Sequence, residues 1–186
     1  ADANARRTDI SMFVGCVLNQ GKRGKVSSCQ IFGSGSFTSR TYLPVSDIDL
    51  VLVTGDTNGD STDNSNDHDI SSSSSNEMEY ILSVFEALCT EVSLRDAGNS
   101  KLSSMQSPMT IRNVEFINAR TKLCHCLVNN VGVDVTINSA GALTTVLFIE
   151  ECDRYLGNNH IFKRSLVLIK AWALNESPNY VGQSLL

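Results

Sequence analysis

The feature that most constrains the fold is a pair of short segments that alternate apolar and other side chains with the period of a β-strand. The first is Ile48–Thr54, which contains Asp49 and directly follows Asp47. The second is Val131–Ile137, whose valines share one face while Asp134 lies on the other. Successive side chains of a strand point to opposite faces, so all three aspartates lie away from the apolar layer. Acids in such positions are costly unless they hold cations, so the pattern predicts two central strands with a cation-binding face.

A glycine-serine pair upstream of the first strand predicts a phosphate-binding turn. Ten residues separate Gly35-Ser36 from Asp47. Glycine lets backbone amides and the serine hydroxyl approach a phosphate closely, and a helix that begins there adds the partial positive charge of its N-terminus. The same pair of residue types occurs just before, as Gly33-Ser34, so both pairs are candidates for the turn. The spacing to Asp47 favours the second pair.

Apolar periodicity predicts the remaining elements and a mixed sheet flanked by helices, which is an α+β fold. Three strands that follow one another through short turns are expected to pair antiparallel. The expected helices contain residues 10–18, 37–42, 78–92, 140–156 and 162–175, and the expected strands are 26–32, 48–54, 111–119, 123–128 and 131–137. Trp172 is expected in the core of the last of these helices, 162–175.

Composition marks one unusual stretch, and together with the expected elements it divides the chain into three parts. Residues 55–76 consist mainly of Ser, Asp, Asn, Thr and Gly, which bury too little surface to order a chain, so this stretch is predicted to be a disordered insert. The expected parts are an N-terminal helix (1–24), a domain built around the sheet (25–139) and the first helices of a second, helical domain (140–186). The chain lacks an initiator Met and stops within that second domain, so we expect a fragment of a longer protein.

Charge and cysteine usage exclude several classes of protein. The formal charge is −5, and the insert with its five Asp and no Lys, Arg or Glu accounts for all of it, so the rest of the chain is neutral and is expected to bind nucleic acid only modestly. Six cysteines without a Cys-x-x-Cys pair predict reduced thiols in the cytoplasm or nucleus. Adjacent strand residues such as Cys124-His125-Cys126 cannot converge on one zinc ion. The longest apolar runs are shorter than the roughly 18 residues of a membrane span.

Several of these segments resemble a known family. The spacing of the Gly-Ser pair to Asp47 and the text of residues 41–50 resemble the DNA polymerase β superfamily of nucleotidyltransferases, and within it the non-canonical poly(A) and poly(U) RNA polymerases. Residues 114–134 and 162–177 resemble a poly(A)-polymerase/oligoadenylate-synthetase-like subfamily familiar from plants. The match runs from about Gln30 to the end of the chain and skips residues 55–108.

The resemblance implies a two-metal nucleotidyltransferase with the polymerase β-like fold and the start of a poly(A)-polymerase-associated helical domain. Its reaction is template-independent transfer of a nucleoside monophosphate from an NTP to an RNA 3′-hydroxyl, with Mg²⁺, or Mn²⁺ in its place, as cofactor. A protein partner that recruits the RNA is also expected. Thr145 occupies a position where some relatives have an Asn that contacts the ribose. The residues implied are the catalytic and metal-binding Asp47, Asp49 and Asp134 and the nucleotide-binding Gly35, Ser36, Thr145 and Lys170.

Two other readings stay open at this point. One is a non-catalytic relative that keeps the fold as a binding or regulatory module, although the complete set of three acids argues against it. The other is a synthetase of short oligonucleotides or second messengers. Charge and motifs do not separate these substrates, nor do they choose between adenine and uracil.

Overall fold

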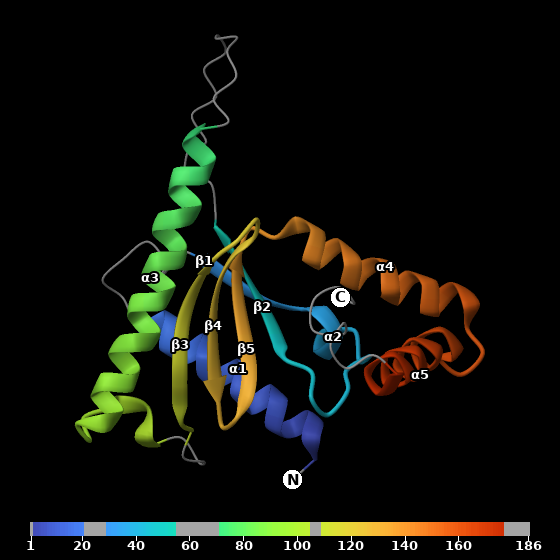
Figure 1. Ribbon diagram of the computed structural model, residues 1–186, viewed down its shortest axis with the longest axis horizontal. Coiled ribbons are helices and arrows are strands. Elements are labelled where there is room, and N and C mark those ends of the chain that lie inside the picture. Colours follow the sequence, from blue (N-terminus) through green and yellow to red (C-terminus); the bar gives the residue numbers. More distant parts are fainter. Residues whose placement is uncertain (1, 21–28, 55–70, 105–108, 177–186) are drawn as a thin grey trace.

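The computed structural model describes residues 2–20, 29–54, 71–104 and 109–176 (Figure 1). Apolar residues with helical spacing form the first, third and last two helices, and the period-two segments form the strands. In chain order the elements are α1 (Ala3–Gln20), β1 (Cys29–Ser34), α2 (Gly35–Thr38), β2 (Ile48–Thr54), α3 (Ser71–Asp96), the 3-10 turn η2 (Lys101–Ser104), β3 (Ile111–Asn118), β4 (Lys122–Val128), β5 (Val131–Ile137), α4 (Ala140–Leu156) and α5 (Ile161–Glu176).

The five strands form one mixed sheet in the order β1-β2-β5-β4-β3. The central pair, β2 and β5, is parallel, and every other neighbouring pair is antiparallel. Asn129 and Asn130 close the tight β4–β5 hairpin with positive φ values of 50° and 65°, the backbone that two-residue hairpin turns require. The predicted α+β fold with a mixed sheet flanked by helices is therefore confirmed.

One face of the sheet carries the core. Helices α1 and α3 pack together against this face, whereas α4 and α5 lie together beyond β2, where α4 contacts α2 and β1 (Figure 1). Strands β4 and β5 alternate buried and half-buried residues, so their other face stays accessible. The largest fully buried side chains are Phe13, Ile10, Leu18, Ile48, Leu52, Ile81, Leu88, Val14, Val51, Val84, Val128 and Val133.

Helix α2 differs from its prediction, which placed a helix at residues 37–42. The helix runs only from Gly35 to Thr38. The hydroxyl of Ser39 donates to the carbonyl of Gly35 at 3.0 Å, and Arg40 adopts a left-handed backbone with φ 59°. A left-handed residue at this position ends a helix, so residues 39–42 turn away from the helix axis.

Helix α3 also differs, since it begins at Ser71 and so takes in residues 71–76 of the predicted disordered insert. That boundary was wrong because a long amphipathic helix can extend past its apolar stripe through residues of moderate helix propensity such as serine. The rest of the predicted insert, 55–70, lies outside the described residues.

The expectation for Trp172 was wrong, because its side chain is 65% exposed. Helix α5 packs on α4, but its less exposed positions are others, such as Lys163, Leu166 and Val167. All six cysteines are free thiols. Within the described ranges, no helix is both long and apolar enough to cross a membrane.

Candidate active site

Three polar side chains form a row across the middle of the sheet. Asp49 of β2 lies opposite Asp134 of the parallel β5, and Asp134 lies opposite His125 of the antiparallel β4. Each is partly exposed, whereas its neighbours in the strand at i−1 and i+1 are buried. Because side chains alternate along a strand, the row lies on the face opposite the core. The two sequence segments that were predicted to carry acids on one face are thus neighbours in the sheet.

Two glycines make room for the carboxylates of the first segment. A β-carbon at Gly35 would overlap Oδ2 of Asp49 and lie 2.6 Å from its Cγ. A β-carbon at Gly132, two residues before Asp134, would overlap Oδ1 of Asp47 and lie 2.7 Å from its Cγ. The structure therefore brings Asp47 next to β5 and places Asp49 between β5 and the turn that opens α2.

Burial and mutual repulsion disfavour the charged forms of these acids. Burial raises the pKa of Asp49 to about 6, with further contributions from Asp134 and Asp47 that Lys170 opposes. The pKa of Asp47 is also raised, first by burial and then by Asp134. Like charges gathered in a partly desolvated place favour either proton uptake or a bound cation.

The donor chemistry of this face fits a divalent cation, because Mg²⁺ and Mn²⁺ prefer carboxylate oxygens. In the conformation described, Oδ1 of Asp134 is hydrogen-bonded to Nδ1 of His125 at 2.6 Å. Within the described part of the chain, no three His, Cys, Asp or Glu side chains already form a metal-binding group. A cation held by Asp134 would therefore compete with His125 for that oxygen.

The glycine turn adjoins this row. Gly35 opens α2 with φ 62°, a backbone that side chains with a β-carbon rarely adopt, whereas Gly33-Ser34 lies within β1. Ser36 is 7% exposed, and its carbonyl accepts a hydrogen bond from the amide of Thr41 at 2.9 Å. Of the two candidate pairs, Gly35-Ser36 is thus the one at a helix start beside Asp49.

The two predicted nucleotide-binding residues on the last helices lie differently. Lys170 of α5 donates to Oγ1 of Thr41 at 3.5 Å, and burial lowers the pKa of its ammonium group while Asp49 opposes that shift. Lys170 therefore approaches Asp49 from α5, a helix outside the sheet. Thr145 of α4 instead donates its hydroxyl to the carbonyl of Gly141 at 2.8 Å, within its own helix. No hydrogen bond among the described residues joins Thr145 to the other predicted site residues.

Sequence reasoning missed two residues of this region. His125 was considered only as a zinc ligand, yet counting back from the two-residue turn at 129–130 places it opposite Asp134. Arg7 of α1 is 4% exposed, donates to the carbonyl of Pro44 at 3.1 Å and lies 4.9 Å from the ring centre of Tyr42. Its charge opposes the raised pKa of Asp47. An arginine early in an amphipathic helix is usually exposed, so no sequence signal marked Arg7.

The chain was compared with known proteins. No protein-family model and no curated protein matches it. A cytoplasmic RNA terminal U-transferase is similar in structure, with a TM-score of 0.58, 16% identity, and 93% of this chain and 40% of that chain covered. A Cid1 poly(U) polymerase structure with bound MgATP has a TM-score of 0.61, 15% identity, and coverages of 93% and 43%. A Cid1 complex with its product ApU has a TM-score of 0.56, 15% identity, and coverages of 91% and 38%.

These likenesses extend over nearly the whole of this chain but over well under half of the similar structures. The chain spans about 40% of the length of the structures it resembles. At 14–16% identity the likeness establishes the fold, which is the one that the sequence resemblance implied. The 186-residue chain therefore has the polymerase β-like nucleotidyltransferase fold.

Proposed function

We propose that this protein is a template-independent RNA 3′-terminal nucleotidyltransferase that transfers a nucleoside monophosphate from an NTP to a 3′-hydroxyl. The observation that carries the proposal is the register of Asp49 opposite Asp134, with Asp47 against Gly132 and Gly35 against Asp49. This arrangement sets three carboxylates beside a turn of the type that binds phosphate. It is supported by similar structures described as a terminal U-transferase and a poly(U) polymerase.

In this proposal Asp47, Asp49 and Asp134 hold two divalent cations, Mg²⁺ or Mn²⁺. When bound, such ions neutralise the charge that develops on the entering and leaving oxygens. The protein's own part is positioning, since phosphoryl transfer asks little covalent chemistry of side chains. In the same proposal Asp134 accepts the proton of the attacking hydroxyl.

The nucleotide would lie between the sheet and α5. We assign the β and γ phosphates to the amides at Gly35-Ser36 and to the ammonium group of Lys170, which neutralises the triphosphate from the opposite side. Thr145 would contact the ribose only after its hydroxyl leaves the carbonyl of Gly141. We further propose that α4 and α5 begin a second, helical domain.

The choice of nucleotide is the first experiment. The protein, expressed at the full length that its transcript encodes, is incubated with a 5′-labelled RNA oligonucleotide, Mg²⁺ and one NTP at a time. We expect RNA extension with UTP or ATP that stops when the divalent cation is chelated. Binding of NTP without extension in either Mg²⁺ or Mn²⁺ would favour the non-catalytic module. Short products formed without any RNA primer would favour the oligonucleotide synthetase.

Lys170→Met is expected to raise the KM for NTP at least tenfold and to leave the KM for RNA nearly unchanged. The substitution keeps the length of the side chain and removes one charge-assisted contact to phosphate, and such a contact contributes enough for a tenfold change. Lys122→Met is the matched control, because Lys122 is also half-buried but begins β4, away from the proposed triphosphate site. Equal KM values for NTP in both variants would remove Lys170 from the site.

A further inference from the structure

A cavity lies outside the row formed by Asp49, Asp134 and His125. It has a volume of about 460 Å³ and lies between the turn that follows α2 and the first half of α5. A cavity of this size is large enough for a small ligand or one nucleotide unit and is much larger than a single phosphate needs. Its walls are formed by Arg40, His160, Lys163, Arg164, Val167 and Leu168.

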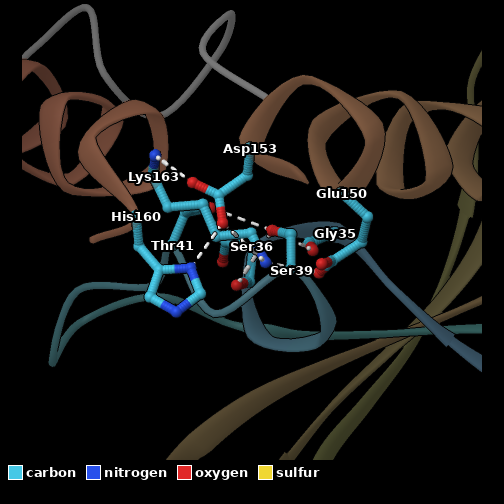
Figure 2. Close-up of polar contacts among 8 residues, drawn as sticks. All are labelled: Gly35, Ser36, Ser39, Thr41, Glu150, Asp153, His160 and Lys163. Carbon is cyan, nitrogen blue, oxygen red and sulfur yellow. Dashed lines mark hydrogen bonds and ion pairs between the residues drawn. The ribbon is translucent and has the colours of Figure 1, made fainter. Parts of the chain in front are cut away.

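Two of its four basic residues already have acidic partners (Figure 2). The Nζ of Lys163 lies 2.6 Å from Oε1 of Glu150 and 3.9 Å from Oδ2 of Asp153. The same Oδ2 lies 2.6 Å from Nδ1 of His160. Lys163 and Asp153 are 8% and 5% exposed, so this pair forms the buried floor of the cavity, whereas the side chains of His160 and Glu150 are 74% and 47% exposed.

The other two basic residues are not neutralised. Arg40 and Arg164 are exposed, and neither guanidinium forms a hydrogen bond or ion pair with any residue that the structure describes. Between them Val167 and the 70%-exposed Leu168 supply an apolar wall. Guanidinium groups beside an apolar surface match a ligand that has both an anionic group and a flat apolar part.

The backbone holds Arg40 in place at a cost. Its φ of 59° is a conformation that glycine adopts readily and arginine does not. The flanking Ser39 and Thr41 are fully buried, and their hydroxyls are hydrogen-bonded to each other at 2.9 Å. The amide of Arg40 donates to the carbonyl of Phe37 at 3.1 Å. A fixed arginine in a backbone that favours glycine suggests that the side chain has a role in binding.

We propose that this cavity binds a phosphodiester-linked nucleotide of single-stranded RNA, with Arg40 and Arg164 on the phosphate and the apolar wall against the base or sugar. The proposal rests on the nucleotidyltransferase function proposed above. Phosphate contacts from arginine combined with stacking surfaces are the usual means of binding single strands. The triphosphate is assigned to Gly35, Ser36 and Lys170, and none of these lines the cavity. The RNA is the other phosphate-bearing substrate of the reaction.

The test is fluorescence anisotropy of a labelled 15-nucleotide RNA with the full-length protein and the Arg40→Gly and Arg164→Gln variants. We expect each variant to bind RNA about three- to tenfold more weakly, and the double variant to show a salt dependence that is shallower by roughly 0.7 per lost phosphate contact. Arg40→Gly should unfold at the same temperature as the wild type or higher, because glycine relieves the backbone. The KM for NTP should stay unchanged.

Arg120→Gly is the control, since Arg120 is exposed in the turn between β3 and β4 and its loss changes the net charge equally. RNA affinity within twofold of the wild type in the double variant overturns the cavity as an RNA site, while extension activity would still support the proposed function. A raised KM for NTP with unchanged RNA affinity shows that the cavity takes the free nucleotide. A wild-type protein that binds no RNA removes both proposals.

Discussion

Asp49→Asn is expected to lower nucleotide transfer at least a thousandfold and, in metal-free buffer at pH 8, to make the protein more stable. The carboxylate is assigned to both cations, and an amide of the same shape neither neutralises a cation nor repels Asp47 and Asp134. Loss of activity together with a gain in stability would show that Asp49 has a functional role. Replacing a residue with a purely structural role would lower the stability instead. Transfer that persists in this variant would remove the proposed metal site.

The stability gain should depend on pH in a defined direction. The folded state raises the pKa of Asp49 from 3.8 to about 6, mainly through burial, so the folded protein binds this proton more tightly than the unfolded chain. The wild type is therefore most stable relative to the variant below pH 4, and it loses that advantage as the pH rises from about 4 through 6. Above pH 6 the ionised carboxylate costs about 3 kcal/mol. Thermal unfolding at pH 4 and pH 8 measures both ends of this range.

Added Mg²⁺ gives a readout that does not require activity. A ligand that binds only the folded state raises the unfolding temperature by mass action, so Mg²⁺ or Mn²⁺ should stabilise the wild type and leave Asp49→Asn unchanged. Asp9→Asn is the control, because Asp9 is an exposed acid on α1. If Mg²⁺ stabilises all three proteins equally, the cation binds elsewhere.

The parts of the fold that the sequence predicted best are those whose pattern reports burial directly. Strands β2 and β5 and helix α4 have the predicted bounds, since each alternates or repeats its apolar residues over its whole length. The shared face of Asp49 and Asp134 followed from the same period. Predicting β2 and β5 as neighbours needed only the assumption that both strands are central. The structure shows that they are neighbours, hydrogen-bonded in parallel.

The features that sequence reasoning missed are those that depend on what a neighbouring element supplies. Trp172 belongs to an amphipathic helix. Periodicity shows which residues form the apolar stripe of such a helix, but it does not show whether another element covers that stripe. Arg7 is buried because Tyr42 and Pro44 fold over it from a distant part of the chain. The end of α2 depends on the hydroxyl of Ser39 and the left-handed backbone of Arg40, neither of which has a periodic signature.

Gly35→Ala is expected to lower transfer at least a hundredfold without unfolding the protein. The substitution has two costs. One is the left-handed backbone, which a β-carbon disfavours by roughly 1–2 kcal/mol. The other is the overlap of that carbon with Oδ2 of Asp49, which moves a proposed metal ligand. Only the overlap with Asp49 should lower the rate of transfer, because a displacement of about 1 Å in a reacting group lowers the rate on the order of a hundredfold.

Gly98→Ala separates these two costs. Gly98 also has a positive φ, 71°, but a β-carbon there meets nothing within 4 Å. Both variants should therefore lose similar stability from the backbone, whereas only Gly35→Ala should lose transfer and the rise in unfolding temperature that Mg²⁺ gives the wild type. Equal transfer rates in the two variants would mean that the close approach of Gly35 to Asp49 is a matter of packing. A deficit confined to Gly35→Ala would tie the glycine turn and the acidic row into one site, because the three atoms nearest to the added carbon all belong to Asp49.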